Sequence, residues 1–425
     1  MNFCALCVLL LVGLQTLLFG VLGCFKLASR EVSEMTVVRL VRWTYSGNFL
    51  LACAASVAFL AGSSGRIVIP LGEWISTSQY DFHFVLELDA LSVPFLLLAT
   101  GLGGVITAFS ARYLHRDPGF ERFFMFTALF GLGDLLTVLA GSVEVLYCAW
   151  EMIGLASAML IAFFHERPGP VRNSLYIFVL YRISDLALLW GTVGVCNLFY
   201  NGDFSTFLGV DGWPSGRTSL SPSGALGLGL FFLVAAMGKA GQVPFSGLLP
   251  RAMEGPTPST AIFYGALSVH AGAFLLLRIS PMLDVSPLLS GLTLGVGLAS
   301  AFYATFVGRV QTDVKTKLAY AALAQVGLIF AEIGLGLRVL PVLHCMGHAI
   351  LRTVQFLQSP SYLHETHELH SAVGDSGLRR PRRMRFYAWA QPKGRLESYT
   401  VEPFLRFCGD LRKLDQRVLN WLVGP

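Results

Sequence analysis

Long apolar runs without ionisable side chains alternate along the chain with short polar stretches. Residues 1–25, 43–65, 90–111, 218–238 and 285–308 contain no Asp, Glu, Lys or Arg. About 20 apolar residues are enough to cross the roughly 30 Å hydrocarbon layer of a membrane as a helix. A membrane β-barrel would instead show alternating segments of about ten residues. The pattern therefore predicts an all-α, polytopic membrane helix bundle.

The apolar runs predict about eleven transmembrane helices. They lie near residues 2–25, 46–63, 90–111, 122–140, 143–164, 173–200, 222–248, 258–280, 286–308, 317–335 and 339–358. The first run lacks the basic flank and short apolar core of a signal peptide, so we interpret it as a span. The stretches RIVIPLGEW and FHFVLEL, between the second and third spans, alternate as strands do and predict a small extracytoplasmic β-hairpin.

Lys and Arg predict the orientation, because loops on the cytoplasmic side of a membrane are enriched in both. With the N-terminus outside and the C-terminus inside, the inner loops carry thirteen of these residues and the outer loops four. Only 13% of all residues are charged and 54% are hydrophobic, which a membrane protein explains. We expect a multi-pass protein of the cell (inner) membrane.

Three regions are expected. Residues 1–84 hold two spans and the hairpin, residues 85–360 the core of the bundle, and residues 361–425 a basic cytoplasmic tail with an amphipathic helix. The tail contains LRRPRRMR, which suits anionic lipid headgroups. A solvated flank without a special role is an equally good interpretation.

Ionisable residues inside the predicted spans are costly, about 2.5–3.5 kcal/mol each on insertion scales, and are therefore candidates for function. They are Asp134, Glu151, Arg182, Asp185, Lys239, His270, Glu332, His344, His348 and Arg352. Carboxylates, a lysine and histidines on successive helices are the groups of a proton relay. Interhelical hydrogen bonding is the structural alternative.

Spacing places some of these residues together. His344, His348 and Arg352 recur every four residues and share one helix face. Arg182 and Asp185 are three residues apart, within reach of an intrahelical pair. The two histidines have the spacing of a metal site, but no HExxH glutamate accompanies them, so a hydrated proton path is favoured and no metal is assigned.

Lys239 and Pro244 raise a further question, because both are unfavourable inside a membrane helix. A proline interrupts helical hydrogen bonding, and a broken membrane helix is tolerated where it is buried in protein or lines a cavity. We therefore expect a helix break at Pro244 beside Lys239, with Glu151 tuning the charge of that lysine.

Several motifs in family order resemble the antiporter-like proton-translocating family, which includes the large membrane subunits of respiratory complex I and of multisubunit cation/proton antiporters. They are LELDALSVPF, CAWEMIGLAS, YRISDLALL, GKAGQVPFSGLLPRAMEGPTPSTA, QTDVKTKLAYAALAQVGLIF and HCMGHAILRTVQFL. Together they cover roughly residues 85–360.

The resemblance implies roles for individual residues. Glu151, Lys239, His344 and His348 match the proton relay of the family. Arg182, Asp185, Arg352, His270, Glu332 and Asp134 are assigned to charge tuning or gating. Arg352 stands where complex I subunits commonly have lysine, and an arginine does not readily release a proton. The membrane pattern ends near residue 360, so we expect one complete relay centre rather than two.

The sequence AIFYGALSVHAGAFLLLR is most similar to the membrane subunit (DabB) of the DAB inorganic-carbon transporters. That resemblance implies that the chain energises uptake of CO2 or bicarbonate through protons or Na+. It also implies a large soluble partner of the DabA type, resembling a zinc carbonic anhydrase. Zinc is expected only in that partner, and no cofactor in this chain.

Two other functions stay open. The chain could serve as a proton-pumping subunit of an NADH-quinone oxidoreductase-like complex or of a multisubunit Na+/H+ antiporter. A scaffold that only anchors a partner is the third hypothesis. No nucleotide loop, haem spacing or nucleic-acid motif is present, so we expect a transporter subunit rather than an enzyme in itself.

Overall fold

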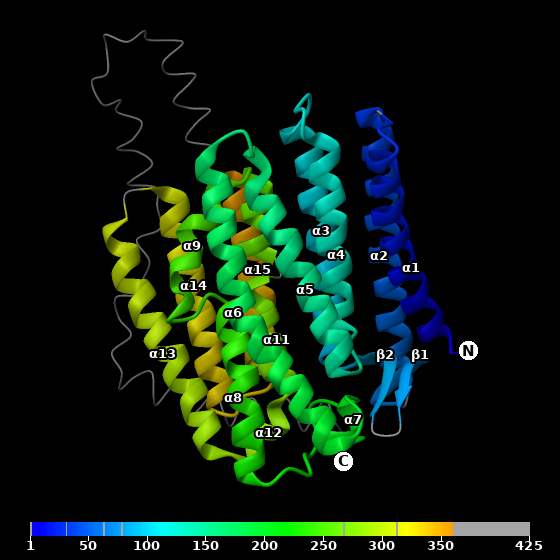
Figure 1. The fold of residues 1–425 in the computed structure, drawn as a ribbon, viewed down its shortest axis with the longest axis vertical. Helices are drawn as coiled ribbons and strands as arrows, with labels where there is room; N and C mark the ends of the chain where they lie inside the picture. The colour runs from blue at the N-terminus through cyan, green and yellow to red at the C-terminus, as the bar shows by residue number, and fades with distance from the viewer. Residues whose placement is uncertain are drawn as a thin grey trace.

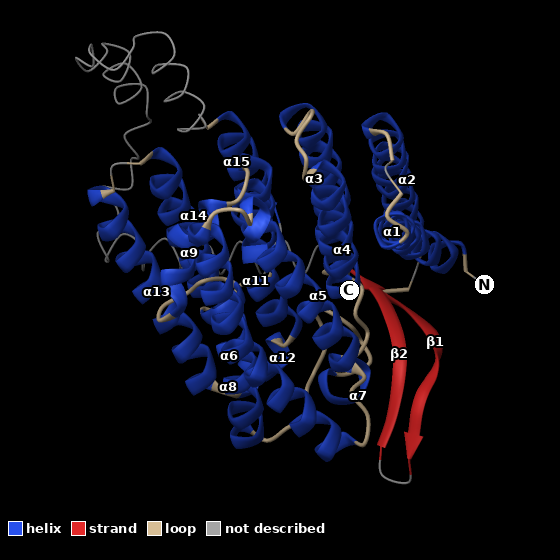
Figure 2. Ribbon diagram, turned by 45° about the horizontal axis from the view of Figure 1, so that its top comes forward, coloured by secondary structure: helices blue, strands red, loops and turns tan. Residues whose placement is uncertain are grey.

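Helices that run side by side make up nearly all of the structure (Figures 1 and 2). The computed structural model describes residues 2–359, apart from residues 31, 63, 78–79, 267 and 312. The longer helices are α1 (Phe3–Leu27), α2 (Glu34–Ala61), α3 (Ser92–Tyr113), α4 (Phe120–Val138), α5 (Val143–Ile161), α6 (Pro168–Phe199), α8 (Pro222–Lys239), α11 (Ser268–Arg278), α13 (Pro287–Val310), α14 (Val314–Gly334) and α15 (Val339–Gln358). In both views α1 and α2 form one edge of the bundle and α13 lies at the other.

Shorter elements connect these helices. They are α7 (Phe204–Leu208), α9 (Leu248–Arg251), α10 (Thr257–Thr260) and α12 (Ser280–Val285), four irregular turns of helix, and the strands β1 (Arg66–Thr77) and β2 (Tyr80–Asp89). One of the irregular turns, Ala261–Ala266, is a π-helix that leads into α11. The proposed division at residue 360 falls at the edge of the described chain, and the predicted tail helix lies outside it.

Nine of the described helices are long and apolar enough to cross a membrane. Eleven were expected, and the two that fall outside this count are α4 and α15. Both carry several ionisable side chains, among them Asp134 in α4 and Arg352 in α15, which lower their apolar content. The bundle is thus a multi-pass membrane protein, while the predicted orientation stays a prediction.

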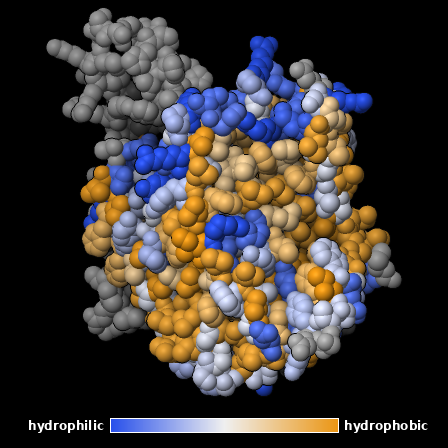
Figure 3. Space-filling model, viewed as in Figure 1, coloured by the Kyte–Doolittle hydropathy of each residue, from blue (hydrophilic) through white to orange (hydrophobic). Residues whose placement is uncertain are grey.

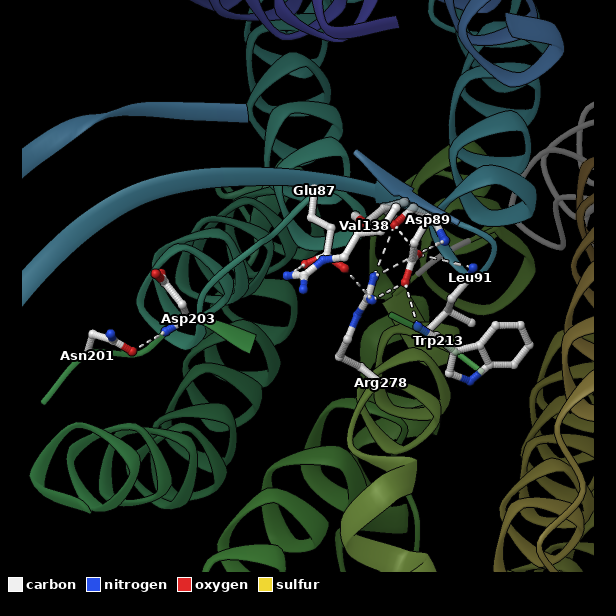
Figure 4. Close-up of polar contacts among 10 residues, drawn as sticks. Glu87, Asp89, Leu91, Val138, Asn201, Asp203, Trp213 and Arg278 are labelled. Atoms are coloured by element: carbon white, nitrogen blue, oxygen red, sulfur yellow. Dashed lines mark hydrogen bonds and ion pairs between the residues drawn. The ribbon is translucent and has the colours of Figure 1, made fainter. Parts of the chain in front are cut away.

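The predicted hairpin is confirmed, because β1 and β2 pair antiparallel from Arg66–Asp89 to Thr77–Tyr80. Strand β1 is mostly exposed, whereas the last five residues of β2 are buried against the bundle. The buried end of β2 carries Glu87 and Asp89, which meet Arg278 at the end of α11 (Figure 4). This ion cluster fixes the hairpin to the helices.

Helices α13 and α14 pack backbone against backbone. A Cβ atom on Gly297 would lie 2.5 Å from the Gly327 carbonyl oxygen, and one on Gly327 would lie 2.7 Å from the Gly297 carbonyl oxygen. Small residues allow this approach, which is a common basis of helix association in membranes.

Candidate functional site

Helix α8 ends at Lys239, which confirms the helix break predicted beside this lysine. Gly241 has φ +63°, a left-handed conformation that glycine adopts at little cost. Pro244 then precedes a short 3-10 helix over Phe245–Gly247. The break therefore places Lys239 in the last turn of α8, and its side chain is fully buried.

Aromatic and carbonyl groups surround the Lys239 ammonium. Its Nζ donates to the carbonyl oxygen of Trp150 at 3.0 Å and lies 4.0 Å from Asp185 Oδ1. The rings of Trp150 and Tyr181 lie 4.9 and 4.8 Å away, at cation–π distance. These contacts stabilise the Lys239 ammonium inside the protein, where bulk water does not reach it.

Close packing of α6 and α8 brings Asp185 to Lys239. A Cβ atom on Gly238 would lie 2.1 Å from the Cβ of Ser184, so only glycine fits there. Because Ser184 precedes Asp185 and Gly238 precedes Lys239, the same contact brings the two charged side chains together.

Arg182 joins Asp185 to Glu151. Its Nη2 donates to Asp185 Oδ2 at 2.8 Å, which confirms the predicted intrahelical pair, and its Nη1 forms an ion pair with Glu151. The order of the charges is therefore Glu151, Arg182, Asp185, Lys239. The sequence predicted that Glu151 tunes the charge of Lys239. In the structure Asp185 is the acidic side chain beside Lys239, and Arg182 lies between Asp185 and Glu151.

Gly154 leaves room for this charge cluster. A Cβ atom at Gly154 would lie 2.9 Å from Arg182 Nη2 and 3.4 Å from Lys239 Nζ. Sequence reasoning missed Gly154, although it lies in the quoted motif CAWEMIGLAS. It also missed Trp150 in the same motif, whose Nε1 donates to Asp185 Oδ1 at 2.8 Å.

His270 and His348 face one another at the contact between α11 and α15. His270 Nε2 and His348 Nδ1 are 2.9 Å apart, and Arg352 Nε donates to His348 Nε2 at 3.4 Å. Since Arg352 has only donors, His348 accepts at Nε2 and carries its proton at Nδ1, facing His270. The predicted shared face of His348 and Arg352 is thus confirmed.

His344 has a carboxylate partner. Its Nδ1 lies 2.8 Å from Glu332 Oε1, and its Nε2 lies 3.0 Å from Gln325 Oε1. The His344 and His348 rings are 6.5 Å apart between centroids, so α15 presents both to neighbouring helices. Among the described residues, His, Cys, Asp and Glu side chains form no group of three that could hold a metal ion.

The two clusters lie on either side of the contact between α8 and α11. A Cβ atom at Gly272 would lie 2.5 Å from the carbonyl oxygen of Ala236. Ala236 lies one helical turn before Lys239, and Gly272 lies two residues after His270. Asp134 joins neither cluster through a hydrogen bond or ion pair with the described residues, and lines a cavity between α1 and α4 instead.

A third cluster, at the end of the hairpin, was not expected from the sequence. Arg278 donates to Asp89 Oδ2 at 2.5 Å and to Glu87 Oε1 at 3.4 Å (Figure 4). Arg66 donates to Glu87 Oε2 at 2.7 Å. Burial by itself raises the pKa of Asp89, but Arg278 and the hydrogen bonds from Ser92 lower it below its ordinary value. The LELD stretch of the sequence contained both acids, yet nothing in it indicated Arg278 as their partner.

The surface between the ends of the bundle is mainly apolar, as lipid or a partner subunit requires (Figure 3). A hydrophilic patch interrupts it where α5 and α6 lie. The side chains of Glu151 and Arg182, on these two helices, are 25% and 32% exposed. The charge cluster thus extends from buried Lys239 to the side of the bundle.

Residues 140–416 match the protein family described as "NADH:quinone oxidoreductase/Mrp antiporter, TM", and residues 74–124 match "NADH-Ubiquinone oxidoreductase (complex I), chain 5 N-terminus". NADH-quinone oxidoreductase subunit L of Mycobacterium tuberculosis (strain ATCC 25618 / H37Rv) is 31% identical over 355 residues, which is 80% of this chain and 55% of the relative. Its counterpart in Escherichia coli (strain K12) is 30% identical over 78% of this chain and 54% of the relative. The chain spans about half the length of these curated relatives.

Solved structures share the fold. A chain of the Mrp complex from Dietzia sp. DQ12-45-1b superposes with a TM-score of 0.70 at 26% identity, over 88% of this chain and 39% of that one. A chain of the membrane-bound sulfane sulfur reductase, an archaeal respiratory membrane complex, superposes with a TM-score of 0.68 at 19% identity, over 82% of this chain and 70% of that one. The second likeness concerns the fold alone.

Proposed function

The chain belongs to the family of NADH:quinone oxidoreductase and Mrp antiporter membrane subunits, and on this premise we propose that it translocates protons within a multisubunit membrane complex. The observation that carries the proposal is Lys239, buried at a helix break between two aromatic rings with Asp185 4.0 Å away. A lysine in such a place can exchange its proton, whereas an arginine stays charged.

The charge order suggests how Lys239 is loaded and unloaded. Asp185 contacts both Arg182 and Lys239, so a shift of its carboxylate toward Arg182 would leave the Lys239 ammonium without its counter-ion and favour release of the proton. Glu151 holds Arg182 from the other side and so controls how far Asp185 can move. Glu151 is thus proposed to act on Lys239 through the two residues between them.

The histidines are proposed to receive the proton. His270 and His348 share a 2.9 Å contact, and His344 with Glu332 continues the polar path across α15 and α14. Arg352 acts as a fixed charge that orients His348. Protons or Na+ stay the two candidate ions, and the two kinds of group here, a lysine and histidines, favour the proton.

Proton flux into proteoliposomes driven by a potassium diffusion potential tests this proposal. Lys239→Gln and Asp185→Asn are expected to lower the flux of the purified complex at least about tenfold, because each removes a partner of the central pair. The control is Lys26→Gln, which changes an exposed lysine at the end of α1. Unchanged flux in both variants would show that Lys239 is structural and that a scaffold role is the better explanation.

Partners are part of the proposal. The relatives are named as subunits of NADH-quinone oxidoreductases and of an Mrp complex, and this favours a respiratory or antiporter assembly over inorganic-carbon uptake. The partly exposed Glu151 and Arg182 support a neighbouring subunit at α5 and α6, since an exposed ion pair is costly against lipid.

Inorganic-carbon uptake is the second candidate, and the sequence AIFYGALSVHAGAFLLLR together with Arg352 favours it. In that case the partner is a soluble DabA-type subunit with zinc. Affinity purification of the chain from its native membranes distinguishes between the two proposed functions. A zinc-containing partner with carbonic anhydrase activity supports carbon uptake, and redox or antiporter subunits support the first proposal.

A further inference from the structure

A small cavity of about 30 Å³ lies between α1, α2, α3 and α4, and its lining includes no residue of the lysine or histidine clusters. A cavity needs about 10–15 Å³ to hold one water-sized particle, so this one holds about two. Its polar lining consists of Gln15, Tyr45, Asn48, Thr100, Thr127 and Asp134.

Asp134 is the one acidic residue in this lining, and it is only 4% exposed. The other buried acids described above have guanidinium partners, as Asp89 has in Arg278. Asp134 forms no hydrogen bond or ion pair with any residue that the structure describes. Lys239 acts on Asp134 electrostatically but does not form an ion pair with it. A buried carboxylate without a direct partner costs several kcal/mol, so this group requires a proton or a cation bound against it.

Hydrogen bonds among the neighbouring residues determine which atoms remain available. Gln15 Nε2 donates to the Ala128 carbonyl oxygen at 3.0 Å, which fixes the orientation of its amide. Gln15 Oε1 therefore accepts from Asn48 Nδ2 at 2.9 Å, and Asn48 Oδ1 is left over. Within the described part of the chain, Asn48 Oδ1 and Thr127 Oγ1 are buried without a hydrogen-bond partner.

Two glycines leave space for the polar side chains that line the cavity. A Cβ atom at Gly131 would lie 2.6 Å from Tyr45 Oη and 2.8 Å from Gln15 Nε2, and one at Gly103 would lie 2.6 Å from the Tyr45 ring. Gly131 and Asp134 are three residues apart on α4, on the same face. Glycine at these two positions therefore leaves space for the polar side chains that line the cavity.

We propose that this cavity is a binding site for a small monovalent cation of the size of Na+, held by Asp134 and by the oxygens of Asn48 and Thr127. The unpaired groups are oxygens, which hard cations prefer as ligands. One carboxylate balances one positive charge, whereas a divalent ion would leave an excess charge inside the membrane. Lys239 is not among the ligands of the site, although its charge acts on Asp134 electrostatically.

Equilibrium binding of 22Na+ to the full chain in lipid nanodiscs tests the proposal, with choline chloride keeping the ionic strength constant. The wild type is expected to bind about one ion per chain with saturation. Asp134→Asn is expected to weaken binding at least about tenfold, because it removes the only charged ligand.

A pair of isosteric variants on α4 provides the control. Thr127→Val removes an unpaired buried hydroxyl that lines the cavity and is expected to weaken binding about threefold or more. Thr137→Val removes an unpaired buried hydroxyl of the same helix that does not line it, and should leave the affinity unchanged. Because neither change breaks a hydrogen bond among the described residues, both variants are expected to fold.

Three binding results would each overturn the site, and a fourth result concerns thermal stability. The binding results are the absence of saturable Na+ binding, equal affinity in the wild type and Asp134→Asn, and equal affinity in the two threonine variants. A thermal stability that depends on pH through Asp134 but not on Na+ would show that the carboxylate holds only a proton, and would overturn it as well. Lys239→Gln is expected to keep Na+ binding while losing proton flux, so failure of the proton proposal is recognised separately.

Discussion

At the scale of single residues, the charged cluster depends on residues without side chains as much as on its acids and bases. Gly154 and Gly238 allow α5, α6 and α8 to approach until Asp185 contacts both Arg182 and Lys239. A side chain at Gly154 would occupy space that Arg182 uses, and one at Gly238 would collide with Ser184 and push α8 away from α6. The helix backbones must therefore approach closely before the charged side chains of the cluster can interact.

Gly154→Ala tests this dependence. The new methyl group would lie 2.9 Å from Arg182 Nη2, so the flexible guanidinium is expected to move away from Asp185. Proton flux should fall severalfold while the melting temperature changes by only a few degrees, because alanine favours the helix by about 1 kcal/mol. Gly295→Ala is the control, since a Cβ there would meet nothing within 4 Å. Wild-type flux in Gly154→Ala would contradict the dependence on close packing.

At the scale of elements, several structures were predictable from the sequence because each has a local cause. Alternation predicted the hairpin of β1 and β2, and Pro244 predicted the end of α8 beside Lys239. The pairing of Arg182 with Asp185 followed from helical spacing. These features depend on residues that are close in the sequence, which is why a single sequence was enough to predict them.

Other contacts could not be predicted, because they depend on which helices become neighbours. The order Glu151, Arg182, Asp185, Lys239 is determined by the packing of α5, α6 and α8. The count of spans differed for a related reason: the ionisable residues of α4 and α15 lower the apolar content by which spans are recognised. In the folded bundle Arg352 of α15 donates to His348, a contact that the composition of the helix does not reveal.

Helix packing gives a prediction at this scale. Gly297→Leu would force α13 away from α14, because even a Cβ atom there would lie 2.5 Å from backbone atoms of α14. We expect a loss of stability of about 2–5 kcal/mol, as for other overpacked or disrupted core sites. Gly295→Leu, on the same helix but with open space around it, should change stability by less than about 0.5 kcal/mol. Unfolding in mixed SDS micelles compares the two, and equal effects would contradict the packing argument.

At the scale of the whole molecule, the buried cluster of Asp89 and Arg278 connects distant parts of the chain. The hairpin precedes α3, whereas Arg278 ends α11, and Trp213 donates its backbone N–H to Asp89 as well (Figure 4). Three segments that are far apart in the sequence thus meet at one carboxylate. The cluster holds the hairpin end of the bundle together.

Asp89→Asn is expected to destabilise the protein by about 3–5 kcal/mol, because Arg278 keeps its charge and loses a buried partner. The pKa of Asp89 is lower in the folded protein than in the unfolded chain, so its contribution is complete above about pH 4 and is lost as the pH falls through the folded pKa. The difference in thermal stability between wild type and variant should therefore be large at pH 7 and shrink at pH 3. Glu73→Gln, an exposed change in β1, is the control.

The charged and titratable groups described above have one consequence for the energetics of transport. Glu151, Asp185, Lys239, His270 and His348 lie on five different helices that run side by side (Figures 1 and 2). In the proposed relay a proton passes from one helix to the next, and this transfer between helices has a component parallel to the membrane plane. The membrane potential supplies about 2.3 kcal/mol per 100 mV only for charge that moves along the membrane normal. The lateral component of the proposed transfer is therefore insensitive to voltage, and the electrical driving force acts only on displacement of the proton toward either membrane surface.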